Sequence, residues 1–157
     1  MKRRSFLLGL PVVVLAGAAA LYFGRARAEP KPPVNDLRTP GVAIDGYDPV
    51  AYFEDQRPEK GSRDFTMRWQ GVEWRFASAA HRDLFAADPE RYAPAYGGYC
   101  AYGTAQGYLV KIEPEAWTIH DGRLYLNYDL SVRDTWLADI DDYVARADRN
   151  YPGLIGN

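Results

Sequence analysis

The sequence is poor in residues that bind metals or form covalent cross-links. Its 157 residues include one cysteine, two histidines and two methionines. A single cysteine excludes an internal disulfide, so Cys100 is a buried thiol, half of an intermolecular bridge, or part of a metal or redox site. The sequence also contains no Cys-x-x-Cys pair, Gly-x-Ser-x-Gly elbow, phosphate-binding loop or dinucleotide fingerprint. Spacing alone therefore assigns no chemistry.

Basic residues open the chain and are followed by an apolar run that extends to about Phe23. A basic cluster, an apolar run and small residues near Ala28 are the parts of an export signal. The segment Arg3–Leu7 also resembles a twin-arginine signal, whose pathway carries folded proteins. We therefore predict that residues 1–28 are a twin-arginine-like export signal and that the domain is periplasmic. An uncleaved signal would anchor the domain to the membrane.

The chain beyond the predicted signal is acidic. Without residues 1–28, 14 basic residues remain against 21 acidic ones, which gives a net charge of −7. An acidic domain without a basic stripe argues against nucleic acid as a partner. The partners that we expect are a metal ion or a small ligand, with the membrane reached only through an uncleaved signal.

Residues 29–41 contain four prolines, which favour extended geometry and remove backbone donors, so we predict a flexible linker there. The domain itself is predicted over residues 42–154, with no internal repeat. Its fold class is α+β, as a small single domain of two β-hairpins with a short helix between them and a C-terminal helix packed across.

Alternating apolar and polar residues predict both hairpins. The first pairs 65–69 with 72–76 around Gln70-Gly71, and the second pairs 117–120 with 123–127 around Asp121-Gly122.

Helix-capping residues and apolar spacing predict the helices. Ser78 is expected to cap a helix over 79–87, with Leu84 and Phe85 facing the core. Ser131 is expected to cap a final helix that runs to about Arg149. Residues 108–112 are expected to form a separate strand.

The glycine-rich run Tyr96–Gly103 surrounds the cysteine with residues that free the backbone and with aromatic rings. Glycine permits positive φ and close backbone approach, so such a run is typical of a tight loop over a core or a ligand. Its tyrosines, Tyr96, Tyr99 and Tyr102, are candidates for the wall of a cofactor or ligand pocket.

Four side chains are candidate metal ligands: Cys100, His81, His120 and Met67. Thiolate and imidazole are softer donors than carboxylate, so a pair of Cys100 and His81 would suit copper or zinc better than magnesium or calcium.

Four ordered blocks resemble the YHS domain family, in its exported stand-alone branch: Gly46–Phe53, Gly71–Ser78, Phe85–Tyr92 and Tyr96–Ala101. The wider YHS and TRASH group is associated with heavy-metal handling. Its metal-binding members carry Phe-Cys-Ser-x-x-Cys-x-x-x-Phe where this chain has Phe76 to Phe85, with Ala77 and His81 in place of the cysteines. The resemblance implies a role in metal handling with one ligand position kept.

We therefore predict an exported YHS-domain protein that holds or delivers a transition metal ion, copper before zinc or iron. Its ligands would be His81 and Cys100, with His120 and Met67 as weaker candidates. Two alternatives stay open: a binding module for a small organic or haem-like ligand in a tyrosine-lined pocket, and a redox enzyme that uses Cys100 activated by His81. An enzymatic role is the less expected one.

Overall fold

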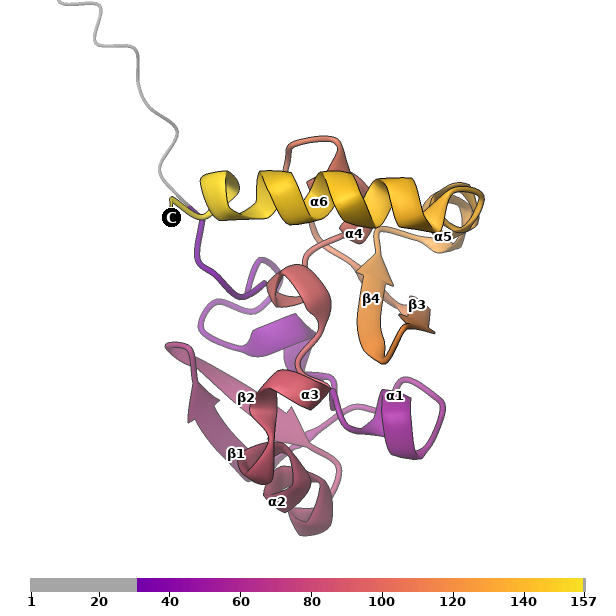
Figure 1. Cartoon of the computed structure of the whole chain (residues 1–157). Coiled ribbons are helices and arrows are strands. Elements are labelled where there is room, and N and C mark those ends of the chain that lie inside the picture. Colours follow the sequence, from indigo (N-terminus) through magenta and orange to yellow (C-terminus); the bar gives the residue numbers. More distant parts are fainter. Residues whose placement is uncertain (1–30, 157) are drawn as a thin grey trace, which may run out of the picture.

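The structure is a computed structural model that describes residues 31–156, so the predicted export signal lies outside it. Two separate antiparallel hairpins form its sheets: β1 (Ser62–Trp69) with β2 (Val72–Phe76), and β3 (Glu113–His120) with β4 (Arg123–Asn127). The helix α6 (Ile140–Leu154) lies across one end of the molecule (Figure 1). The predicted α+β class is confirmed. Within the described residues, no helix has the length and apolar character needed to cross a bilayer.

The two hairpin turns and the start of α2 lie where the local turn and capping residues predict them. Both hairpin turns have two successive residues with positive φ, as two-residue turns of this kind require. The helix α2 (Ala79–Ala87) begins after Ser78, whose hydroxyl accepts a hydrogen bond from the backbone N–H of His81 at 3.1 Å. Phe85 on this helix is fully buried, but Leu84 is 39% exposed, because the short helix buries only the stripe centred on Phe85.

The chain after Asn127 differs from the prediction, because two helices stand where one was expected. α5 (Leu130–Leu137) is capped by Asp129 rather than Ser131, since the Asp129 carboxylate accepts from the backbone N–H of Val132 at 2.8 Å. α6 then follows after a break at Ala138 and Asp139.

The strand predicted over 108–112 is irregular. The carbonyl of Val110 accepts from the backbone N–H of Cys100 at 3.3 Å, so this segment pairs with the glycine-rich run instead of a strand.

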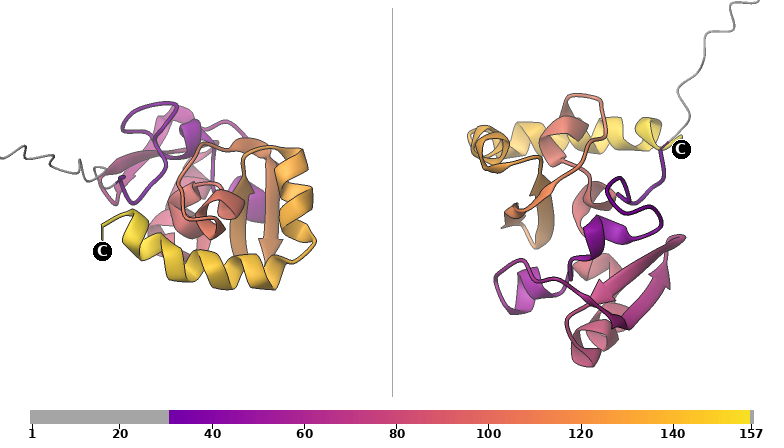
Figure 2. Two further views of the ribbon diagram at one scale, coloured as in Figure 1. Left: turned by 90° about the horizontal axis from the view of Figure 1, so that it is seen from above. Right: turned by 180° about the vertical axis from the view of Figure 1, so that it is seen from behind.

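The segment predicted as a flexible linker packs against the domain. We call residues 31–36 the strap. Val34 is fully buried, and Asn35 donates its backbone N–H to the carbonyl of Gly97 and its side-chain amide to the carbonyl of Gly98, both at 2.9 Å. The extended backbone at the prolines leaves carbonyl oxygens available as acceptors. The Tyr99 hydroxyl donates a hydrogen bond to the carbonyl of Pro32 at 3.0 Å. The described chain thus begins beside the C-terminal end of α6 (Figure 2).

The chain contains two copies of one structural unit, so the prediction of no internal repeat is corrected. The first copy runs from η1 (Ala43–Gly46) through α1 (Ala51–Glu54), β1, β2 and α2 to α3 (Pro89–Tyr92). The second runs from η2 (Ala95–Gly98) through α4 (Ala101–Ala105), β3, β4 and α5 to α6. Both begin with a turn containing two successive positive φ values, and both hairpins have an irregular register at the same place in the first strand.

The repeat is not visible in the sequence, because equivalent positions of the two units, such as helix caps and buried rings, are filled by different residue types. The capping residues Ser78 and Asp129 are 51 positions apart, as are the fully buried Phe85 and Trp136. The cysteine also has a counterpart: Cys100 follows Gly98-Tyr99 just as Asp48 follows Gly46-Tyr47. The thiol therefore takes the position that a carboxylate takes in the first unit.

Candidate functional site

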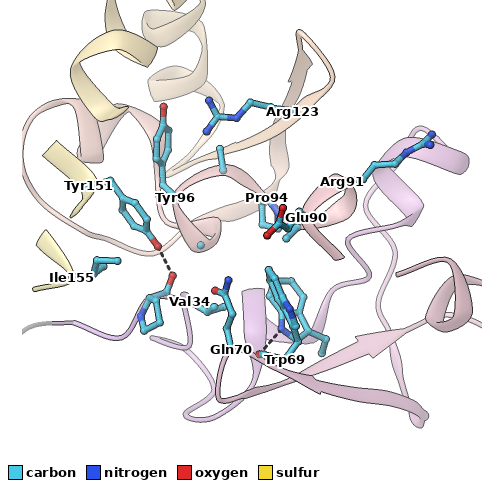
Figure 3. A pocket seen from close by; sticks show the side chains of 15 residues that line it. Val34, Trp69, Gln70, Glu90, Arg91, Pro94, Tyr96, Arg123, Tyr151 and Ile155 are labelled. Carbon is cyan, nitrogen blue, oxygen red and sulfur yellow. Dashed lines mark hydrogen bonds between the residues drawn. The ribbon is translucent and has the colours of Figure 1, made fainter. Parts of the chain in front are cut away.

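A cleft of about 520 Å³ opens where the two units meet. Figure 3 shows its walls, which come from the turn of the first hairpin, the link between the units, the start of β4, the strap and the end of α6. Aromatic rings and a few polar groups line it, among them Trp69, Gln70, Glu90, Tyr96, Arg123 and Tyr151. A concave site with apolar walls and few polar groups is the usual form of a small-molecule site.

The backbone around Tyr96 is fixed by close contact with the strap. Tyr96 and Gly97 have φ of +56° and +60°, and a β-carbon added to Gly97 would overlap the carbonyl oxygen of Pro33. Only glycine therefore allows the strap to lie against this turn. The strap supplies Val34 to the cleft wall, so the glycine shapes the site indirectly.

Tyr96 forms an aromatic wall that stays neutral. Its hydroxyl donates to Asp148 Oδ1 at 3.0 Å, and its ring lies 5.7 Å from the ring of Tyr151. Burial, followed by the negative charge of Asp148, raises the pKa of Tyr96 well above its usual range. The site therefore presents a phenol and not a phenolate.

Two side chains of opposite charge reach the cleft from different units. The guanidinium carbon of Arg123 lies 5.6 Å and 5.4 Å from the ring centres of Tyr96 and Tyr125, a cation–π arrangement. Glu90, from α3, directs its carboxylate into the cleft, and the side-chain amide of Gln70 enters from the hairpin turn (Figure 3). The cleft thus combines flat aromatic faces with the guanidinium of Arg123, the carboxylate of Glu90 and the amide of Gln70.

The three tyrosines predicted to share a pocket are separated. Tyr96 lines the cleft, whereas Tyr99 is fully buried and holds the strap. Tyr102 lines a second cavity of about 240 Å³, together with Cys100 and Tyr128.

Cys100 is a buried neutral thiol with an exposure of 1%. Its sulfur accepts a hydrogen bond from the backbone N–H of Gly103 at 3.3 Å and donates to Asn127 Oδ1 at 3.7 Å. Burial raises the pKa of this thiol above its ordinary value, although nearby backbone N–H groups oppose the effect. Such a thiol is a poor nucleophile near neutral pH.

His81 is held by a buried carboxylate. Its Nδ1 lies 2.7 Å from Asp48 Oδ2, and its Nε2 lies 3.8 Å from Asp55 Oδ2. Asp48 also accepts from the backbone N–H groups of Val50 and Ala77, both at 2.8 Å. Nδ1 is thus engaged by this carboxylate, whereas Nε2 makes no hydrogen bond among the described residues. The contact between Asp48 and His81 spans 33 positions, so local sequence spacing does not reveal it.

The predicted metal ligands lie in separate environments. The contacts of His81 on α2 and of Cys100 before α4 have no residue in common, and these helices lie towards opposite ends of the molecule (Figures 1 and 2). His120 Nε2 lies 3.1 Å from Asp141 Oδ1, and Met67 packs against the core. Across residues 31–156, no three His, Cys, Asp or Glu side chains gather in a way that could hold a metal ion.

Sequence inspection missed most of the cleft. Trp69 was expected only as the last residue of the first predicted strand, and Glu90, Arg123 and Tyr151 carried no motif. One signal was present, because Trp69-Gln70-Gly71 places a large ring beside an exposed turn. Comparison with protein-family models, curated proteins and solved structures finds no match, so membership of the YHS family stays a prediction.

Proposed function

We propose that this protein binds a small organic molecule in the cleft between its two units. The observation that carries the proposal is the cavity of about 520 Å³ walled by Trp69, Tyr96 and Tyr151. This volume falls in the range of about 300–1,000 Å³ that small-molecule sites occupy. Aromatic faces would bind an apolar body, and the few polar groups would fix its orientation.

The construction of the site also supports binding. Its parts come from both units and the strap, and hydrogen bonds to Asp148 and to the Pro33 carbonyl hold Tyr96 and Tyr151 in place. A wall fixed before the ligand arrives loses little side-chain freedom on binding, which favours affinity.

A native mass spectrum of the full chain, purified without denaturant, tests the proposal. We expect an additional organic mass that is lost in Trp69→Leu and kept in Trp117→Leu. Trp117 is a suitable control because it is partly buried like Trp69, but its ring packs on Tyr52, away from the cleft. A bare protein mass, together with no thermal stabilisation by a library of small organic molecules, would refute the proposal.

A second candidate function is the binding of a transition metal ion, copper before zinc or iron, by His81. The observation that favours it is the Asp48–His81 hydrogen bond of 2.7 Å, which orients the ring and leaves Nε2 facing Asp55 at 3.8 Å. Metal-bound histidines commonly donate their other ring N–H to a carboxylate in this way. In this form of the proposal Asp55 takes the place of Cys100 as the second ligand, and water completes the shell.

Copper titration separates the two candidates. We expect Cu²⁺ binding to be lost in His81→Ala, weakened in Asp55→Asn and kept in His120→Ala, whose imidazole also faces a carboxylate. Equal affinity in the wild type and in His81→Ala would remove this candidate. The pattern of residues 1–28 favours the periplasm for either function, which cell fractionation would test.

A further inference from the structure

The charges of the cleft indicate the class of its ligand. We propose that the cleft binds a zwitterion of the amino-acid type: an ammonium group and a carboxylate on an apolar or aromatic body. This inference rests on the proposed function of the cleft.

Arg123 is suited to bind the carboxylate. Its Nη1 lies 3.5 Å from Asp148 Oδ1, at the limit of a hydrogen bond, and Asp148 is the one acidic partner within 4 Å of its guanidinium in the described part of the chain. A guanidinium has five N–H donors, so most of them stay available. The rings of Tyr96 and Tyr125 support its plane, which prepares it for two parallel bonds to a carboxylate.

Glu90 is suited to bind the ammonium group. Its carboxylate is exposed and points into the cleft (Figure 3), and no ion pair within 4 Å joins it to a basic side chain among residues 31–156. The neighbouring Arg91 also lines the cleft, but its guanidinium lies over the ring of Tyr92 at 5.2 Å and is directed away from the Glu90 carboxylate (Figure 3). The amide oxygen of Gln70, from the hairpin turn, is a further acceptor that lines the cleft.

The aromatic residues complete the arrangement. Trp69, Tyr96 and Tyr151 line the cleft, and the two tyrosine hydroxyls already donate to Asp148 and to the carbonyl of Pro33. The rings therefore offer mainly apolar faces to a ligand. Because Glu90 belongs to the first unit and Arg123 to the second, one zwitterion would contact both units.

Three indole compounds test the inference by calorimetry on the full chain. Tryptophan carries both charges, tryptamine only the ammonium group, and indole-3-propionate only the carboxylate. We expect tryptophan to bind at least about threefold more tightly than either analogue, since each analogue lacks one of the two charged contacts and both contacts are partly screened by solvent. Glu90→Gln should weaken tryptophan and tryptamine but not indole-3-propionate, and Arg123→Gln should weaken tryptophan and indole-3-propionate but not tryptamine. Arg63→Gln is the matched control and should change none of them, because Arg63 is an exposed arginine on β1 that does not line the cleft.

The outcomes distinguish a failure of the zwitterion inference from a failure of the proposed function of the cleft. If an analogue with one charge binds as tightly as tryptophan, or if neither variant discriminates between the analogues, the zwitterion inference is overturned while the cleft remains a ligand site. The same holds if none of the three binds but the native protein carries another organic mass. If none binds and the native spectrum shows only bare protein, both the inference and the proposed function fail.

Discussion

Replacing Gly97 with alanine should release the strap from the domain. The added β-carbon would overlap the Pro33 carbonyl oxygen and approach the Tyr151 hydroxyl to 2.9 Å. Because the first contact is with backbone, no side-chain rotation relieves it. We therefore expect the strap to move away from η2 while the rest of the fold is retained.

The cost has two parts. Alanine at a φ of +60° costs about 1 kcal/mol in any setting. Release of the strap adds the loss of the two hydrogen bonds that Asn35 donates to η2, about 1 kcal/mol each, and of the Val34 burial, about 1.5–3 kcal/mol. The hydrogen bond that the Asn35 carbonyl accepts from the backbone N–H of Ile44 is lost as well. The freed backbone regains conformational entropy, which offsets part of this loss. We expect the free energy of unfolding to fall by roughly 3–4 kcal/mol in total.

The matched control is Gly122→Ala. Gly122 has a φ of +74°, and nothing lies within 4 Å of an added β-carbon, so only the conformational cost of about 1 kcal/mol applies. Urea unfolding measures both variants. Hydrogen exchange of the Asn35 and Ile44 amides, which bond to Gly97 and to Asn35, should lose protection only in Gly97→Ala. Equal destabilisation by the two substitutions, with both amides still protected, would refute the reasoning.

Three further predictions concern buried polar groups. Asp48→Asn should lower the free energy of unfolding by roughly 3–5 kcal/mol in urea melts, because an amide nitrogen would face backbone N–H donors that the carboxylate satisfied. Asp55 is more exposed, so Asp55→Asn should lower the free energy of unfolding by less than about 1 kcal/mol. Equal losses of stability in the two variants would contradict this prediction. Iodoacetamide should modify Cys100 at pH 8 at least about 100-fold more slowly in folded than in urea-unfolded protein, and comparable rates would refute a buried neutral thiol. Burial raises the pKa of Tyr151 to about 12, so its contribution to stability is complete below pH 10 and is lost as the pH rises towards 12. The free energy of unfolding, measured from pH 10 to pH 12, should therefore decline less steeply in Tyr151→Phe than in the wild type. The same slope in both proteins would contradict the raised pKa of Tyr151.

The parts of the fold that depend on neighbouring residues could be predicted from sequence. Asp121-Gly122 between alternating arms and Ser78 before an apolar helix are signals within a few positions of one another, and the structure has both features. The strap could not be predicted, because the four prolines of residues 29–41 suggest flexibility unless the partners of the backbone carbonyls are known. Those partners include the hydroxyl of Tyr99, which bonds to Pro32 from 67 positions away.

The candidate site was harder to predict for the same reason. Five separate segments build the cleft, and the residues that face it from one segment carry no information on those from another. The proposed pairing of His81 and Cys100 assumed that the glycine-rich run folds back on α2. Instead the Asp48 carboxylate is hydrogen-bonded to Nδ1 of His81, and the Cys100 thiol is hydrogen-bonded to Asn127 and Gly103. The hidden repeat explains this arrangement, since Asp48 and Cys100 are counterparts in two different units.

The most direct test of the cleft as a ligand site uses the four tryptophan indole N–H groups as reporters in an ¹⁵N–¹H spectrum. Trp69 and Trp74 line the cleft, whereas Trp117 packs on Tyr52 and Trp136 lies in the core beside Tyr125. On titration with the small-molecule fraction of a cell extract, the account predicts that the Trp69 and Trp74 signals shift while the other two stay. A spectrum in which all four signals stay, or in which only Trp117 and Trp136 move, would contradict it.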